Sequence, residues 1–165
     1  MELNFNLNCE IHPDIEILNA YNKLYSWIPN GEQIRPTEKN IEMKNILIEK
    51  IKKEYNSMRD YILINVFNYK FYKNKEKKYE AVDYNIKLNK LEVCRFKYNV
   101  NDSTFHYIMW YTCDKSDLIP KEINRDIHRS IYNILRTEEF KYVYYENPKM
   151  SVTDIYHIHV FFVKL

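Results

Sequence analysis

The last strand-like segment of the chain constrains the fold most, because its residues alternate in two sets. In an extended strand, successive side chains point to opposite faces of the sheet. One face of this segment would carry only apolar or aromatic side chains: Tyr156, Ile158, Val160 and Phe162. The opposite face would carry His157 and His159, roughly 7 Å apart by strand geometry, between Ile155 and Phe161. The apolar face predicts a sheet packed on a core, and the other face predicts a rigidly held pair of imidazoles.

Two imidazoles on one strand make a candidate functional site. Histidine changes its charge near neutral pH and can serve as an acid–base group, a nucleophile or a metal ligand. His157 and His159 are therefore the first candidate catalytic residues, and His106 joins them if its own strand pairs with the last one. The alternative, which the sequence leaves open, is that these imidazoles are half-buried and bonded only to backbone or solvent.

The first half of the chain favours helices. Apolar residues recur at helical spacing in 13–28 and again in 36–55. Ser57, three residues before Asp60, resembles a capping box and predicts the start of a third helix. Before these helices, the alternation in residues 1–12 predicts an edge strand or an ordered arm.

The second half favours strands. Alternation and β-branched or aromatic residues predict strands, with turn residues between them, in 82–88, 91–100, 104–113 and 141–145. A helix over 120–138, capped by Ser116 and Asp117, carries an apolar stripe that should pack on one sheet face: Ile123, Ile127, Ile131, Ile134 and Leu135. This order predicts an α+β fold in a single domain, 1–165. N-terminal helices are followed by a mostly antiparallel sheet, with one long helix inserted before the last two strands.

Composition excludes several functional classes. The formal net charge is only +2, so we expect no membrane partner and no nucleic acid. Residues 69–79 interleave lysines with aromatic residues, a pattern typical of single-strand binding, but the balanced charge favours a plain connecting loop. Gly31 is the single glycine, which argues against a glycine-rich phosphate loop.

The cysteines and the codon usage indicate where the protein works. Cys9, Cys94 and Cys113 are an odd, widely spaced set, which predicts free thiols in a reducing compartment, the cytoplasm. We find neither a signal peptide nor an apolar run long enough to cross a bilayer. The richness in Asn, Lys, Ile and Tyr indicates an AT-rich genome, such as that of a large DNA virus, and hence the cytoplasm of an infected host cell.

Three separated stretches follow the order of a known family. Residues 54–63 read Glu-Tyr-Asn-Ser-Met-Arg-Asp-Tyr-Ile-Leu, and His106 precedes Trp110 by four residues. Residues 146–161 contain Asn-Pro, Ser-Val and His-Ile-His-Val in that order. From about residue 30 onward the chain thus resembles the fungal N-acetylglucosamine-induced protein family, a domain family of unknown function. Asn56 stands where that family usually has Gly. The resemblance implies kinship and no particular activity.

The same C-terminal residues also resemble a second fold. A strand with His106, a helix, and then Asn, Ser-Val and His-x-His are similar to the histidine-triad nucleotide-binding fold, in which an imidazole attacks an α-phosphorus. This resemblance implies His159 as nucleophile and His157 as its orienting partner. The chain departs from the pattern at Phe161, where a third His would stand, and in the four residues that separate Val152 from His157.

Together these features predict a domain that binds or hydrolyses a small molecule, such as a nucleotide or a sugar nucleotide. The His face would carry the chemistry, and Trp110 would stack on a base or sugar ring. Asn147 and Ser151 would contact the ligand from the preceding loop. We expect no cofactor.

Two alternatives stay open. The first is a metal site, in which His157 and His159 combine with His106 or Asp154, since zinc accepts imidazole and carboxylate ligands. The second is a non-catalytic viral accessory protein that binds a host protein through exposed tyrosines on a nearly neutral surface. Whether the protein is an enzyme at all is not decided by the sequence.

Overall fold

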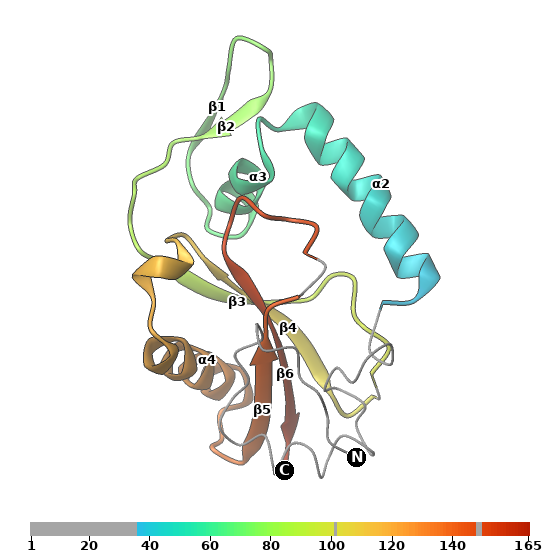
Figure 1. Ribbon diagram of the computed structural model, residues 1–165, viewed down its shortest axis with the longest axis vertical. Helices are drawn as coiled ribbons and strands as arrows, with labels where there is room; N and C mark the ends of the chain where they lie inside the picture. The colour runs from blue at the N-terminus through green and yellow to red at the C-terminus, as the bar shows by residue number, and fades with distance from the viewer. Residues whose placement is uncertain (1–35, 101, 148–149) are drawn as a thin grey trace.

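The computed structural model describes residues 36–100, 102–147 and 150–165 (Figure 1). The helix expected in 13–28 and the strand or arm expected in 1–12 lie outside these residues. In chain order the elements are α2 (Glu38–Glu54), α3 (Met58–Asn65), β1 (Phe71–Lys73), β2 (Tyr79–Ala81), β3 (Asn89–Val93), β4 (Phe105–Tyr111), a 3₁₀ turn (Lys115–Asp117), α4 (Pro120–Leu135), β5 (Phe140–Tyr145) and β6 (His157–Lys164). The predicted α+β order, with one long helix before the last two strands, is confirmed.

Side-chain caps set the start of both described N-terminal helices. The Thr37 hydroxyl accepts a hydrogen bond from the Asn40 backbone N–H (3.2 Å) at the start of α2. The Ser57 hydroxyl accepts one from the Asp60 N–H (3.0 Å) at the start of α3, as the sequence predicted. Such caps satisfy N–H groups that have no partner inside the helix. The Asp60 carboxylate also accepts from the Ala81 N–H (2.7 Å) and so ties β2 to α3.

The main sheet has the order β3-β4-β6-β5, and every neighbouring pair is antiparallel. β4 and β6 are therefore the central strands. Their register places Ile108 opposite His159 and Trp110 opposite His157. β6 is buried along nearly its whole length, because both faces of the sheet are covered.

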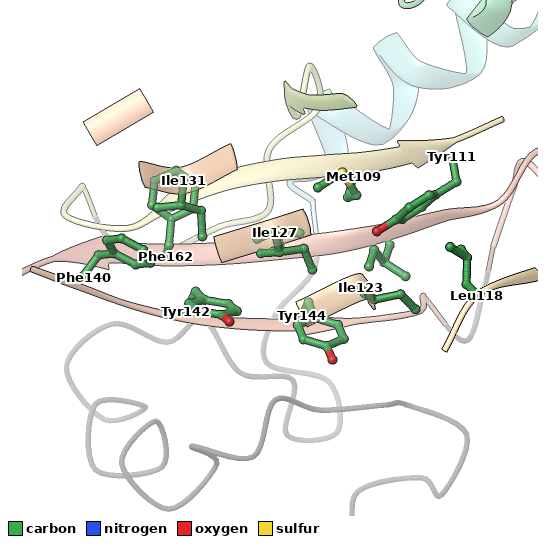
Figure 2. Close-up of a cluster of buried hydrophobic side chains, with 12 residues drawn as sticks. Met109, Tyr111, Leu118, Ile123, Ile127, Ile131, Phe140, Tyr142, Tyr144 and Phe162 are labelled. Atoms are coloured by element: carbon green, nitrogen blue, oxygen red, sulfur yellow. The ribbon is translucent and has the colours of Figure 1, made fainter. Parts of the chain in front are cut away.

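Helix α4 covers one face of this sheet, on the left in Figure 1. Figure 2 shows Ile123, Ile127 and Ile131 packed over the strands, and all three are buried. Their partners on the sheet include Met109, Tyr111, Ile158, Val160 and Phe162. The predicted stripe is therefore correct in its centre, while Ile134, with 40% of its surface exposed, lies outside the core.

The helices α2 and α3 lie on the other side of the sheet, and the β1–β2 hairpin extends beyond α3 at the top of Figure 1. A second apolar cluster forms around α3 from Ile62, Leu63, Ile64, Tyr69, Ala81 and Ile155. Arg59 joins α3 to the segments that flank the main sheet, because its guanidinium donates to the Thr112 carbonyl (2.9 Å) and to the Asp83 carboxylate (3.2 Å). The sheet is thus enclosed between two layers, and the His face looks toward α2 and α3.

Four local predictions are wrong. Residues 82–88 form no strand, and β3 begins at Asn89, where a turn was expected. The strand expected in 91–100 ends at Val93. The expected loop in 69–79 contains β1 and the first residue of β2, and these two strands pair as an antiparallel hairpin. Ser116 does not cap α4: the helix begins at Pro120, and the Glu122 carboxylate accepts from the Ile119 N–H (3.1 Å) instead. Among the described residues, no helix is both long enough and apolar enough to span a bilayer.

The α4 interface should dominate the stability of the domain. Replacing Ile127, which is fully buried, by Ala should lower the free energy of unfolding by about 2–5 kcal/mol, because it leaves a cavity in the core. Ile134→Ala is the matched control on the same helix, and it should cost less than about 1 kcal/mol. Urea denaturation of both variants measures the difference; equal losses would contradict the described packing of α4.

Candidate functional site

A cavity of about 340 Å³ lies between the His face of the sheet and the two N-terminal helices. Helix α2 contributes Leu47, Ile48 and Ile51 to its wall, and α3 contributes Met58, Tyr61 and Ile62. The loop after β3 closes another side with Phe96 and Tyr98. The enclosure is mainly apolar, so the few polar groups on its wall decide what it can hold.

All the predicted site residues except His106 line this cavity: Trp110, Asn147, Ser151, His157 and His159. The rings of His157 and His159 are 6.4 Å apart between centroids. His106 is fully buried and does not reach the cavity wall. His106 contacts the ring of His159, and it is His159 that lines the cavity.

The hydrogen bonds of His106 fix where its hydrogen lies. The backbone N–H of Tyr98 donates to Nδ1 of His106 (3.0 Å), so this nitrogen carries a lone pair. A neutral imidazole with Nδ1 as acceptor carries its hydrogen on Nε2. Nε2 of His106 lies 2.8 Å from Nδ1 of His159 and therefore donates to it. The hydrogen of a neutral His159 is consequently on Nε2.

His157 has the opposite arrangement. Its Nδ1 lies 3.1 Å from the carbonyl oxygen of Ile155, and a carbonyl can only accept. Nδ1 therefore carries the hydrogen, and Nε2 carries a lone pair. No hydrogen bond joins His157 to His159 within the described part of the chain. The orienting partner of His159 is His106.

Aromatic neighbours bury all three imidazoles. Phe161 stacks on His106 at a centroid distance of 4.2 Å, Tyr98 packs on His159 at 5.0 Å, and Trp110 packs on His157 at 4.7 Å. This burial, together with a smaller effect of the nearby Lys97 ammonium, lowers the pKa of His106 to about 3. Burial also lowers the pKa of His157, against smaller opposing effects of the Ile155 carbonyl, Glu146 and Asp154. His106 and His157 are therefore neutral at pH 7.

The cations of the cavity come from its helix and loop side. Lys44 on α2 is half-buried, and Arg95 is exposed beside Phe96. Neither cation forms an ion pair with a described carboxylate. Glu92 also lines the cavity, but it is paired with Lys90 (2.9 Å). Cys94 lines the wall too, and burial raises the pKa of its thiol to about 11, so it is a neutral group at pH 7.

The described residues contain no group of three or more His, Cys, Asp or Glu side chains placed to hold a metal ion. Asp154, considered as a third ligand, accepts a hydrogen bond from the Arg59 backbone N–H (3.1 Å). His106, the other candidate, uses both of its ring nitrogens within the protein.

Sequence patterns identified the strand side of the site and missed the opposite wall. No sequence motif marks Leu47 and Ile48 as cavity residues, because apolar residues at helical spacing indicate only that a helix is buried on one side. Tyr98 reaches the His106 ring through its backbone N–H from the segment after β3, and no pattern in the sequence indicated this contact.

Comparison with known proteins gives no family. No family model matches the chain, and no curated protein matches it. Among solved structures, the chain is similar to one described as "Crystal Structure of HTC1". The identity is 13%, the match covers 92% of this chain and 83% of that one, and the TM-score is 0.44. A likeness this low assigns no function.

The buried imidazole of His106 should make stability depend on pH. Its pKa is about 3 in the folded protein and near 6.5 in the unfolded chain, so below pH 6.5 the unfolded state binds more protons. The contribution of the neutral His106 to the free energy of unfolding is therefore fully present above pH 6.5 and is lost as the pH falls toward 3. Between pH 6.5 and 5 this residue should account for a loss of about 1.5 kcal/mol.

Urea denaturation of the wild type and of His106→Phe, at several pH values in this window, isolates that contribution from those of the carboxylates. The variant should show the smaller loss across the window, whatever its absolute stability. Identical pH dependence in the two proteins would mean that His106 is protonated in the folded state.

Proposed function

We propose that the cavity binds a small molecule of the nucleotide or sugar-nucleotide class, and that the His face takes part in binding or hydrolysing it. The observation that carries the proposal is a partly open cavity of about 340 Å³ whose strand wall presents two oriented imidazoles. Ligand sites of proteins are concave, mostly apolar and supplied with a few convergent polar groups, and their volumes run from about 300 to 1,000 Å³.

The walls offer a complement to each part of such a ligand. Trp110 and Phe96 supply flat apolar surface for a base or a sugar ring. Lys44 and Arg95 supply positive charge for phosphate oxygens, and no described carboxylate neutralises them. Ser151, which is exposed, adds a hydroxyl near the entrance.

His157 is the group best suited to receive a proton. A general base needs a lone pair that faces the ligand, and Nε2 of His157 carries one. Nε2 of His159 carries a hydrogen instead, so His159 would act as a donor. This assignment exchanges the roles that the histidine-triad resemblance implies for the two residues.

The resemblance to the fungal N-acetylglucosamine-induced protein family leads to the same place in the molecule. Five residues of the stretches that carry this resemblance line the cavity: Met58, Tyr61, Trp110, Ser151 and Val152. If the kinship holds, the cavity is the feature that the family shares. Cys94 and Cys113 are free thiols, which supports the proposal of a reducing compartment such as the cytoplasm of an infected cell.

Ligand titration tests the proposal. Thermal-shift and calorimetric titration against a panel of nucleotides and sugar nucleotides should identify at least one that raises the melting temperature and binds with 1:1 stoichiometry. The double variant His157→Ala/His159→Ala should lose this response, whereas Ile134→Ala, far from the cavity, should keep it. A panel without any binder, or equal binding by the double variant, would leave the proposal without support.

A second candidate function is protein–protein interaction without catalysis, as in a viral accessory protein. The observation in its favour is the segment 82–88, whose residues all lie on the surface. Alternate positions of this segment hold large apolar side chains that are 38–53% exposed: Val82, Tyr84, Ile86 and Leu88. Such contiguous apolar surface is typical of a contact with another protein.

Capture of host proteins tests this candidate with matched variants. Tyr84→Ser/Ile86→Ser should abolish capture of a specific partner, while His157→Ala/His159→Ala should retain it. The converse pattern, loss with the histidine variant alone, would assign the interaction to the cavity side of the molecule and contradict this role for 82–88.

A further inference from the structure

We infer that the β1–β2 hairpin binds single-stranded nucleic acid on the face that it turns away from α3, with a base stacked on Tyr72 and phosphates at the neighbouring lysines. This function goes beyond the proposed ligand site, since none of the residues 69–81 lines the cavity. The interleaved lysines and aromatic residues of 69–79 indicated such binding, and only the balanced net charge of the chain argued against it.

The structure shows that the positive charge is concentrated in this hairpin. Residues 69–81 hold five lysines and two glutamates, a formal charge of +3, whereas the whole chain has +2. The rest of the chain is therefore slightly negative. None of the five lysines forms an ion pair with a described carboxylate: Lys70, Lys73, Lys75, Lys77 and Lys78. A low net charge of the chain thus does not exclude a local site for a polyanion.

The hairpin has a fixed backbone. At its tip, the Asn74 side-chain oxygen accepts from the backbone N–H groups of Glu76 (3.0 Å) and Lys78 (3.1 Å). The hairpin is attached to the junction of α2 and α3, where the Asn56 backbone N–H donates to the Tyr79 carbonyl (2.9 Å). The Asn74 amide also donates to the side-chain oxygen of Asn56 (3.1 Å). The lysines are therefore presented on a preorganised support, which reduces the entropy cost of binding.

The strand register places different side chains on the two faces of the hairpin. Phe71 lies opposite Ala81, and Tyr72 lies opposite Glu80. Paired residues point to the same face, and neighbours along a strand point to opposite faces. Ala81 is buried in the apolar cluster around α3, so the face that carries Phe71 is turned toward this helix. Tyr72 and Glu80 therefore point away from α3.

Tyr72 is the ring that can receive a base. Half of its surface is exposed (50%), and it makes no ring contact with any described residue. Phe71 meets the Tyr79 ring edge to face (5.4 Å) on the other side of the hairpin. The backbone pairing continues by one hydrogen bond at each end of the strands, so Lys70 and Lys78 share the outward face, about 7 Å before and after Tyr72. A stacking ring between cations suits a single strand, whose bases are free.

Glu80 distinguishes this inference from a plain solvated surface. Its carboxylate interacts with the Tyr72 hydroxyl and raises the pKa of this phenol, so the negative charge lies beside the expected path of the phosphates. Replacing Glu80 by Gln keeps an acceptor for the hydroxyl and removes the charge. Binding of the nucleic acid should therefore become tighter in Glu80→Gln, although the variant loses a native group.

Fluorescence anisotropy tests the inference with labelled oligo(dT) and oligo(rU) of about 20 nucleotides, a length that covers one binding site. The association constant of the wild type should fall with salt, with a logarithmic slope of about −2 to −3 for three or four lysine contacts. A DNA duplex should bind at least about tenfold more weakly, because its bases are already stacked on one another.

Matched variants locate the contact on the outward face. Tyr72→Ala should weaken binding about 5- to 150-fold through loss of the stacked base. Phe71→Ala is the control, since Phe71 is the neighbouring residue, is equally exposed (53%) and lies on the other face; its Kd should change by less than about threefold. Lys70→Gln/Lys78→Gln should make the salt slope shallower by about 1.4.

Four results overturn the inference: no binding of either oligonucleotide at low salt, equal binding of the duplex, equal effects of Tyr72→Ala and Phe71→Ala, or no tightening in Glu80→Gln. Heparin binding as tight as that of the oligonucleotides would assign the surface to charge alone and also contradicts it. Loss of binding in His157→Ala/His159→Ala would move the nucleic acid to the cavity. The nucleotide panel is independent of all these results, so the proposed function and this inference fail separately.

Discussion

The antiparallel pairing of β4 with β6 is the contact on which the rest of the structure depends. These two strands occupy the middle of the main sheet, so neither has an unpaired edge, and β6 is buried along nearly its whole length. Their register sets Ile108 opposite His159, and this brings His106 within hydrogen-bond distance of the same ring. A slip of one residue would turn the imidazoles toward α4 and the apolar partners of α4 toward the cavity, so both layers enforce one register.

Burying three imidazoles on one face is costly, and the structure offsets this cost with hydrogen bonds and ring contacts. His106 has a partner for each ring nitrogen, and His157 has the Ile155 carbonyl. Because these partners are a backbone donor and a backbone acceptor, they impose opposite tautomers on neighbouring positions of one strand. His106 and His157 are thus held neutral at pH 7, which differs from the arrays of cations and N–H dipoles that bind phosphate elsewhere.

The sequence predicted best where one periodicity extended over a long segment. The stripe of α4 and the alternation of β6 each identified a buried face, because the period alone determines which side chains point together. Boundaries set by tertiary contacts were missed. Residues 82–88 alternate as a strand does, yet they pair with no strand, and the left-handed conformation of Asn85 (φ 54°) interrupts the segment. The cavity itself could not be predicted from the sequence pattern. It forms where side chains of α2, α3 and the loop after β3 fail to fill the space above the imidazoles, and no local pattern encodes such a volume.

Helix α2 has an unusual position in this arrangement, because Ile51 is its one buried side chain among the described residues, while Leu47 and Ile48 face the cavity. The sheet and α4 share a continuous apolar core of their own, whereas α2 packs partly against whatever fills that space. An occupant would therefore serve as part of the interior for α2, and its arrival would raise the protection of the helix amides against exchange with solvent.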